Sequence, residues 1–475
     1  MWVKFEDISS KDDVICVASN WGITTKDTIQ VAFGAKSIFP KLEYREELEL
    51  FRENTFENPG IIMISSALRD KLLLPKGLTY RVKIMDASIG IGPLIGFLMG
   101  MDTARYSPTH MMKYSDRFGI YSLVGGLIYA FSPKHINWEK ETSFGLYYNV
   151  EEEKWIHGNF PLPEVIYRRD FHSNPEDIKK LQEFTNGNLF NSYRFSKYEL
   201  YNFVKMSKEL YPYLPPTELT VDFAQIRNFL TQYQKIIMKP IDLSRGRGIL
   251  FIEKIEGNYK ISDYRGREET TYWMENEDDL ESFFDANKSL FQKYLVQKYL
   301  NLAKVEDSFF DIRVVMHKEL LSVDKDWSWK CTGIECRVAC PNCYLTNISK
   351  GGYPLTLEEA IERSFGLGQE GLCEKVRTFS QNLCMHLDKM GEHYAEFGID
   401  IAVDKNKKLW LIEVNVFPSF KGFKRMNMST YLSIRYEPLL YALSLSKFSK
   451  EALEEKNWNS LEEGSHRVFE EGENE

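Results

Sequence analysis

The sequence predicts a multidomain protein of the α+β class, with a strand-rich N-terminal part followed by a mixed catalytic region. Its 475 residues are too many for one hydrophobic core, and at about 150 residues per domain they suggest roughly three units. Between residues 61 and 166, short apolar runs are separated by Gly and Pro, as in strands joined by turns. From Lys235 onward the pattern alternates between strands and helices, which indicates a mixed α and β region.

Individual elements can be placed from local patterns. The β-type runs are residues 61–64, 81–85 and 126–131. Residues 145–150 and 154–156 flank three glutamates and predict a hairpin. A helix is expected to begin after Ser196, because Ser196 and Glu199 have the spacing of a capping box. A second helix is expected around residues 221–233.

Composition and charge narrow the class of protein. Hydrophobic residues make up 43% and charged residues 27% of the chain, which is ordinary for a globular protein. The net charge of −9 argues against a nucleic-acid-binding face. The longest apolar run, residues 89–101, contains Pro and four Gly and is too short and broken to cross a membrane. With seven cysteines and no signal-like N-terminus, we expect a cytoplasmic protein that binds neither membrane nor nucleic acid.

The first constellation that carries chemistry is a glycine loop between two apolar strands, residues 235–252. Gly246 and Gly248 would let backbone N–H groups approach a polyphosphate, because no side chain blocks the way. Lys239 ends the incoming strand, where its charge could neutralise an α- or β-phosphate. The alternative is an ordinary hairpin with a mobile tip, and the segment alone does not decide between them.

The second constellation is a charged pair on one strand. Asp311 and Arg313 are two residues apart, so they share one face of a strand while Ile312 and Val314 share the other. The carboxylate could mark a ribose hydroxyl and the guanidinium a phosphate. A solvated charged face explains the same pattern equally well.

The third constellation is the most specific, and it predicts a magnesium site. Two apolar strands, residues 398–404 and 409–415, are joined by a short turn. If Asp404 pairs with Leu409, Asp400 lies directly opposite Glu413, with Cβ atoms about 5 Å apart. Asn415 points from the same face. Two like charges this close repel unless a cation lies between them, and a hard dication with oxygen ligands fits. The alternative is a hairpin with an exposed polar face.

A cluster of cysteines falls within 13 residues, and it contains Cys331, Cys336, Cys340 and Cys343. Its last three members have the spacing of an iron–sulfur site. The strand-like alternation from residue 334 to 340 instead puts Cys336 and Cys340 about 13 Å apart, too far to share one metal. We expect buried free thiols, with zinc as the alternative. The same alternation places Arg337 on the opposite face.

Taken in this order, the three constellations resemble those of ATP-grasp enzymes over residues 192–425. Within that class, residues 159–169, 213–217 and 346–352 are similar to the spore-coat-associated YheC/YheD-type group. The resemblance implies an ATP-grasp fold, in which two α+β subdomains grip ATP, with a β-rich and α/β N-terminal region. It also implies endospore coat proteins as partners and a location at the coat.

The resemblance further implies roles for single residues. The ATP-binding residues would be Lys197, Lys239, Ser244, Gly246, Gly248, Gln297, Lys298, Tyr299 and Asp311. The catalytic residues near the transferred phosphate would be Arg313, Arg337 and Lys350. The ligands of Mg²⁺ would be Asp400, Glu413 and Asn415. Lys205 is a rival for the role of Lys197. Gln297 replaces the Glu of many members, so an adenine contact there would use the backbone.

These expectations give a division of the chain and a function. The division is a β-rich region at 1–80, an α/β domain at 81–190, an ATP-grasp domain at 191–445 and an acidic tail at 446–475. The expected function is an ATP- and Mg²⁺-dependent ligase that joins a small-molecule or peptide carboxylate to an amine-type nucleophile through an acyl phosphate. The alternatives are a kinase that phosphorylates a hydroxyl and a non-catalytic ATP-binding coat protein.

Overall fold

The computed structural model describes residues 1–21, 23, 27–46, 48, 54–85, 87–170, 172–242, 247–266, 268–320, 326–341, 346 and 351–449. These residues form four sheets with helices packed beside them, which is the predicted α+β class. Of the helices in this part of the chain, none combines the length and the apolar character that a membrane crossing requires.

Two sheets build the N-terminal lobe. The first has the strand order β4-β3-β8-β7-β1-β6-β2-β5 and the second the order β12-β11-β10-β9-β13-β14. The strands of the first sheet are β1 Trp2–Ile8, β2 Val14–Val17, β3 Gln30–Phe33, β4 Lys36–Ile38, β5 Lys41–Tyr44, β6 Gly60–Ser65, β7 Thr79–Met85 and β8 Ser88–Gly92. Those of the second are β9 Leu94–Leu98, β10 Leu127–Asn137, β11 Thr142–Asn149, β12 Lys154–Pro161, β13 Val165–Arg168 and β14 Leu189–Phe190. The helices are α1 Ser66–Leu72, α2 Pro108–Met111, the 3₁₀ helix η2 Met112–Ile120, α3 Tyr121–Val124 and α4 Pro175–Phe184.

This lobe confirms the strands expected from the sequence. Strands β6, β7 and β10 contain the three predicted apolar runs, and β11 and β12 form the predicted antiparallel hairpin. One continuous hydrophobic core runs through both sheets, from Val3 to Phe190. In the second sheet β10, β9, β13 and β14 are parallel, so their carboxyl ends meet at one edge.

The third sheet has the order β15-β20-β16-β17-β18-β19, and its paired strands are antiparallel. Its strands are β15 Thr217–Leu219, β16 Lys235–Pro240, β17 Leu250–Ile255, β18 Asn258–Asp263, β19 Thr270–Met274 and β20 Tyr294–Lys298. Helices α6 Phe223–Tyr233 and α7 Glu277–Ala286 pack on this sheet, whereas α5 Lys197–Lys205 packs into the core of the fourth sheet, described next. Helix α5 begins one residue after Ser196, with both bonds of the predicted capping box present, and α6 matches the second predicted helix.

The fourth sheet is antiparallel with the order β24-β23-β22-β25-β26, and β21 pairs with β22 beside this path. Its strands are β21 Lys304–Val305, β22 Ser308–Leu320, β23 Trp327–Val338, β24 Tyr353–Leu355, β25 Glu396–Val403 and β26 Leu409–Asn415. The helices are α8 Leu357–Phe365, α9 Glu370–Leu387, α10 Lys421–Met426 and α11 Met428–Leu445. Ile312 and Val314 are buried in the core under this sheet, as the alternation of β22 predicts.

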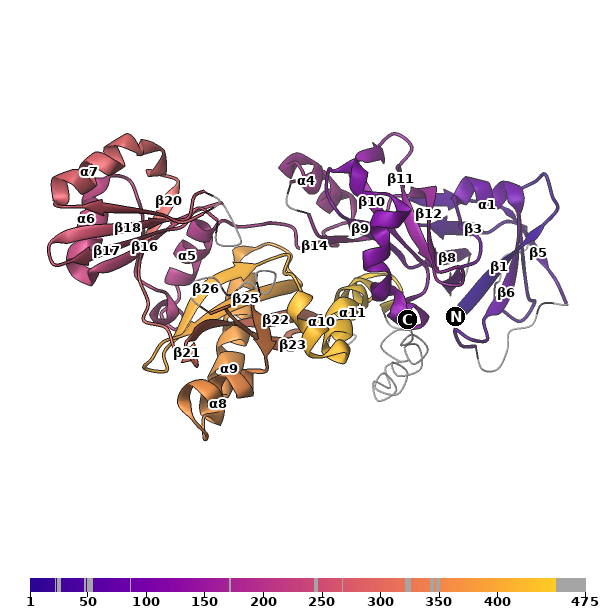
Figure 1. Ribbon diagram of the computed structural model, residues 1–475. Helices are drawn as coiled ribbons and strands as arrows, with labels where there is room; N and C mark the ends of the chain where they lie inside the picture. The colour runs from indigo at the N-terminus through magenta and orange to yellow at the C-terminus, as the bar shows by residue number, and fades with distance from the viewer. Residues whose placement is uncertain are drawn as a thin grey trace.

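Figure 1 shows an elongated molecule, with the third sheet at one end, the N-terminal lobe at the other and the fourth sheet between them. Helix α11 joins the fourth sheet to the N-terminal lobe. Its first part packs with Val315 and Phe423, and its last part enters the core of the N-terminal lobe through Leu439 and Leu443. Helix α11 therefore anchors the fourth sheet to the N-terminal lobe.

Candidate functional site

A cleft of about 170 Å³ lies where helix α5 faces the end of strand β26. Its lining residues are Arg194, Phe195, Ser196, Lys197, Glu199, Leu200, Ile241, Asp242, Glu413, Val414, Asn415, Val416 and Phe417. Because Ser196 caps α5, Lys197 stands at the first turn, and its ammonium lies 3.6 Å from Glu413 Oε1. The cleft thus brings Lys197 together with Glu413 and Asn415, two of the predicted metal ligands.

The register of strands β25 and β26 places Asp400 opposite Glu413, as predicted, but by a different route. Val403, and not Asp404, pairs with Leu409, and a bulge between the pairs Asp400–Glu413 and Ile401–Leu411 restores the alignment. The predicted turn was wrong by one residue. The reason is that the Asp404 carboxylate accepts hydrogen bonds from the backbone of the turn, which lengthens it to residues 404–408.

The predicted reason for a metal also needs correction. The charge of Asp400 is balanced by the protein itself: Arg313 donates to both carboxylate oxygens, and Arg337 lies 3.1 Å from Oδ2. Repulsion from Glu413 therefore does not by itself demand a cation. Burial would raise the pKa of the Asp400 carboxyl, but the two guanidinium groups outweigh it and lower that pKa.

Arg337 also binds Asp311, with two bonds of 2.7 and 2.6 Å. Thr346 donates a further bond of 2.6 Å to Asp311. The charged face predicted for β22 is therefore buried among ion pairs and not solvated, with Arg313 only 6% exposed. We call Asp311, Arg313, Glu335, Arg337 and Asp400 the Asp400 cluster.

Glu335 is the member of this cluster that the sequence analysis missed. It is 2% exposed, pairs with Arg313 across β22 and β23, and its Oε2 has no hydrogen-bond partner among the described residues. Burial raises the pKa of its carboxyl to about 7, although Arg313 and Arg337 oppose the shift. The signal was available, because Glu335 and Arg337 are two residues apart and so share the polar face of a strand whose other face holds Cys336.

Lys239, on β16 of the third sheet, lies near enough to Lys197 and Glu413 for their charges to affect it. Its ammonium donates to Gln297 Oε1 at 2.8 Å, and the Gln297 amide donates to Thr217 Oγ1 at 2.8 Å. Burial, with help from the nearby charge of Lys197, lowers the pKa of Lys239 to about 8, and Glu413 opposes the shift. A buried ammonium beside a second lysine is a ready partner for an anion, because an anion would restore the cationic form.

Two of the expected hinge residues, Gln297 and Lys298, end strand β20, and Tyr299 follows it. The backbone N–H of Lys298 donates to Pro216 and that of Tyr299 to Lys235. The structure has therefore already used the two hinge N–H groups that an adenine ring could have met, and the Gln297 side chain serves Lys239.

Three expected residues, Ser244, Gly246 and Lys350, lie outside the described residues. Gly248 is described and has a φ of 76°, in the left-handed region that favours glycine. The rival Lys205 is at the far end of α5 from the cleft and lies over the Tyr201 ring.

The expectation that the clustered cysteines are free thiols is confirmed in part. Cys331 and Cys336 are free thiols, and burial raises the pKa of the Cys331 thiol to about 11. Cys340 is disulfide-bonded, so the expectation of a free thiol was wrong there. Cys343 lies outside the described residues.

The expected metal ligands carry the kind of donor atom that a magnesium ion prefers, although Asp400 is bonded to two arginines and does not itself line the cleft. Within the described part of the chain, no three His, Cys, Asp or Glu side chains group as metal ligands, but the expected set has an amide as its third member. Asp400, Glu413 and Asn415 supply hard oxygen donors from two paired strands. The open cleft at Glu413 and Asn415 leaves room for water and phosphate oxygens.

Comparison with known proteins gives three findings. Residues 186–445 match the family model for YheC/D-like ATP-grasp proteins. The chain is 26% identical over 419 residues to the endospore coat-associated protein YheD of Bacillus subtilis (strain 168), covering 84% of this chain and 86% of that protein. It is 24% identical over 287 residues to the endospore coat-associated protein YheC of the same organism, covering 59% and 77%.

Among solved structures, the chain is similar to N5-carboxyaminoimidazole synthetase from Staphylococcus aureus. The TM-score is 0.42 at 11% identity, covering 75% of this chain and 78% of that one. It is also similar to D-alanyl-alanine synthetase A from Vibrio cholerae, with a TM-score of 0.40 at 11% identity, covering 74% and 98%.

Proposed function

This chain belongs to the YheC/D-like ATP-grasp family, and we propose that it is an ATP- and Mg²⁺-dependent ligase that joins a carboxylate to an amine-type nucleophile. The observation that carries the proposal is the cleft that Glu413 and Asn415 line together with Lys197, with the charge of Lys239 close enough to interact with Lys197 and Glu413. Oxygen donors and ammonium groups on facing walls suit a metal-bound triphosphate.

In the proposed reaction a carboxylate oxygen attacks the γ-phosphorus of ATP, which forms an acyl phosphate and releases ADP. The amine then attacks the acyl carbon, loses a proton and displaces phosphate. Lys197 and Lys239 hold the α- and β-phosphates, with Ser244, Gly246 and Gly248 as the loop over them. Mg²⁺ bound by Asp400, Glu413 and Asn415 would neutralise charge on the phosphate oxygens.

We propose that Arg313 and Arg337 of the Asp400 cluster stabilise the phosphoryl group during its transfer. If Asp400 were to share an oxygen with Mg²⁺, Arg337 and Arg313 would give up part of their bonding to it, and together with Lys350 they would bind the transferred phosphoryl group. Glu335, whose partner across the strands is Arg313, offers the released guanidinium a replacement acceptor. Asp311, Gln297, Lys298 and Tyr299 are proposed to contact the nucleoside.

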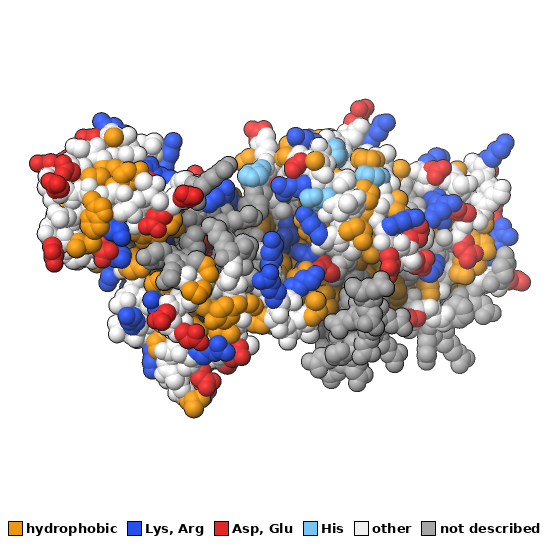
Figure 2. Space-filling view, viewed as in Figure 1, with side chains coloured by type: hydrophobic (Ala, Val, Ile, Leu, Met, Phe, Trp, Pro, Cys, Tyr) orange, Lys and Arg blue, Asp and Glu red, His pale blue; other side chains and the backbone are white. Residues whose placement is uncertain are grey.

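Surface charge supports an anionic substrate. The chain carries a net charge of −9, yet Figure 2 shows Lys and Arg side chains gathered near the middle of the viewed face, where the lobes meet. We propose a small-molecule or peptide carboxylate as the substrate that ATP activates. Since two relatives are named as endospore coat-associated, we also propose that the enzyme works in the cytoplasm beside the forming coat, with coat proteins as partners.

The test is a trapping reaction with ATP, Mg²⁺, a panel of carboxylates and hydroxylamine as a general nucleophile. A ligase releases ADP, phosphate and a hydroxamate in equal amounts, and ¹⁸O from the labelled carboxylate appears in the phosphate. A kinase yields ADP and a phosphorylated hydroxyl compound, without hydroxamate. A coat protein that only binds ATP would give none of these products.

A further inference from the structure

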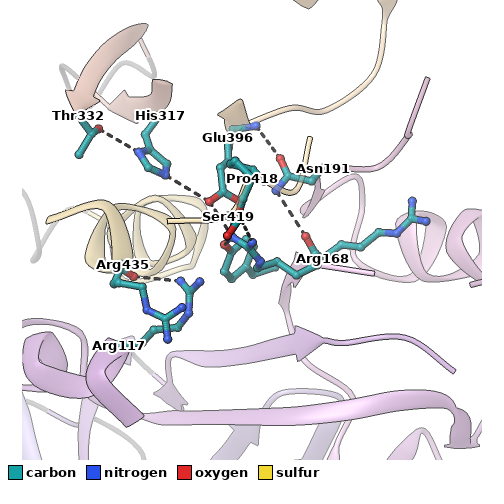
Figure 3. Close-up of polar contacts among 12 residues, drawn as sticks. Arg117, Arg168, Asn191, His317, Thr332, Glu396, Pro418, Ser419 and Arg435 are labelled. Carbon is teal, nitrogen blue, oxygen red and sulfur yellow. Dashed lines mark hydrogen bonds and ion pairs between the residues drawn. The ribbon is translucent and has the colours of Figure 1, made fainter. Parts of the chain in front are cut away.

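A buried polar cluster joins the N-terminal lobe to the strands that carry the proposed metal ligands. Arg169, one residue beyond β13, donates to both carboxylate oxygens of Glu396, at 2.9 and 3.2 Å. Tyr167 donates to Glu396 at 3.0 Å, and His317 Nε2 lies 3.5 Å from it. Figure 3 shows Glu396 between His317 on one side and Pro418 and Ser419 on the other. We call Tyr167, Arg169, His317 and Glu396 the Glu396 cluster.

The guanidinium of Arg169 also bonds the loop that follows β26, the strand of Glu413 and Asn415. Arg169 donates to the Pro418 carbonyl at 2.6 Å and lies over the Phe420 ring at 5.1 Å. From the other side, Arg313 donates to the next carbonyl, that of Ser419, at 3.4 Å. Two arginines from different lobes therefore grip consecutive carbonyls of residues 418–419, only three residues after Asn415.

Packing leaves this loop little freedom to move. A side chain at Gly398 would place its Cβ 2.4 Å from Pro418 Cβ, so the loop lies directly on β25 beside the partner of Asn415. Glu396 begins β25, the strand of Asp400. Burial would raise the pKa of the Glu396 carboxyl, but Arg169 and His317 lower it to about 2, so the ion pair persists at neutral pH. Arg169 is thus bonded to the first residue of β25 and to the loop that follows β26.

We propose that Arg169 is a positioning residue for the metal site, through which the N-terminal lobe sets the position of Asn415. This inference rests on the proposed function. The competing view is that Arg169 is one more interlobe ion pair with no bearing on the site. The two views differ in what they expect of residues 416–420.

The chain offers a matched control. Arg435 on α11 is buried as well, donates to Asp116 at 2.8 Å and to the Lys113 carbonyl at 3.0 Å, and so joins the same two lobes. In the part of the chain that the structure describes, the hydrogen bonds of Arg435 outside its own helix go to Lys113, Asp116 and Arg117, and none goes to residues 416–420. Arg435→Met therefore breaks an interlobe pair while sparing the loop.

The experiment measures two quantities in full-length wild type, Arg169→Met, Arg169→Lys and Arg435→Met. The first is the hydrogen exchange of the backbone amides of residues 416, 417, 419 and 420 without any ligand, since Pro418 has no amide hydrogen. The second is the affinity for ADP with Mg²⁺, by calorimetry. For Arg169→Met we expect roughly tenfold faster exchange and roughly tenfold weaker binding, as for other groups that orient metal ligands. Arg169→Lys keeps the charge but loses the several N–H donors of the guanidinium, so its exchange rate and its affinity should lie between those of wild type and Arg169→Met.

Arg435→Met should leave both quantities within about twofold of wild type, whatever it does to the melting temperature. If Arg169→Met does not fold, Arg169→Lys decides, since it must shift both quantities in the stated direction. Exchange or affinity unchanged in the Arg169 variants, or shifted equally in Arg435→Met, would overturn the inference alone. A wild type that binds nucleotide equally with and without Mg²⁺ would overturn the proposed function as well.

Discussion

The Asp400 cluster and the Glu396 cluster lie on the same pair of strands, yet they are built differently. Arg313 pairs with Asp400, and four residues along β22 His317 pairs with Glu396. Both carboxylates are buried and both have a lowered pKa. In the Glu396 cluster each carboxylate oxygen has a hydrogen-bond donor. The Asp400 cluster instead shares two guanidinium groups among three carboxyl groups and leaves Glu335 Oε2 without a described partner.

This difference separates a fixed contact from one that can rearrange. A buried carboxylate whose oxygens all have donors, like that of Glu396, loses much when its charged partner is removed, because one charge is then left without compensation. A cluster with a spare carboxyl group can exchange partners at small cost, and the proposed binding of Asp400 to Mg²⁺ would require such an exchange. We therefore expect substitutions in the Glu396 cluster to change stability, and substitutions at the metal site to change activity.

The largest effect is expected for Glu413→Gln. The variant keeps the size and one oxygen of the side chain but loses the charge proposed to bind Mg²⁺. Product formation should fall by about 10²- to 10³-fold, as when one preorganised electrostatic group is removed. Stability should change by no more than about 0.5 kcal/mol, because Glu413 loses only a partly exposed pair with Lys197. Product formation is measured beside a thermal melt, and full activity with a lower melting temperature would contradict the proposed role.

Next in size is Glu396→Gln, which leaves Arg169 buried without its counter-charge. We expect a loss of about 3 kcal/mol in the free energy of unfolding at pH 7, measured with urea. Glu151→Gln is the control, because its pair with Lys4 is exposed and should be worth less than about 1 kcal/mol. Equal effects from the two variants would show that the Glu396 cluster is not the stabilising contact inferred above.

The same carboxyl predicts a pH dependence. Folding lowers the pKa of Glu396 from its ordinary 4.5 to about 2, so the unfolded chain binds more protons between these values. The stabilisation, roughly 3 kcal/mol, is present above pH 4.5 and is lost as the pH falls toward 2. The stability difference between wild type and Glu396→Gln should therefore shrink between pH 5 and pH 3. A difference that stays constant over this range would exclude the ion pair as its source.

The smallest effect, and the opposite sign, is expected for Glu335→Gln. Burial raises the pKa of this carboxyl to about 7, so stability is full below pH 4.5 and is lost as the pH rises through 7. At pH 8 the variant should be more stable than wild type by about 1 kcal/mol. This gain in stability stays small because the guanidinium groups of Arg313 and Arg337 lose a negative charge nearby. A destabilised Glu335→Gln at pH 8 would remove the contrast between the two clusters.

Local patterns predicted much of this structure. The capping box at Ser196 needs only a spacing of three residues, and the alignment of Asp400 with Glu413 needs only a hairpin. The bulge in β26 was missed because it depends on how the Asp404 side chain bonds the turn. The hairpin alignment was nevertheless right, since the extra residue in the turn and the bulge offset each other.

The electrostatic partners could not be predicted in the same way. Arg313 and Asp400 are 87 residues apart, and Arg169 and Glu396 are 227 apart. The first pair depends on the order of strands in the fourth sheet. The second depends on how α11 packs the N-terminal lobe against that sheet. No local signal carries that information. This is why the sequence suggested that a metal must relieve the charge of Asp400, whereas the protein supplies two arginines.

The most direct test of the account is calorimetric titration of the wild-type protein with ATP, once with Mg²⁺ and once with a chelator. Because Glu413, Asn415 and Asp400 are proposed to act on the phosphates through the metal, Mg²⁺ should tighten binding at least roughly tenfold, which corresponds to about 1.4 kcal/mol. Glu413→Gln should lose most of this gain. Equal affinities in the two titrations would contradict the proposed metal site.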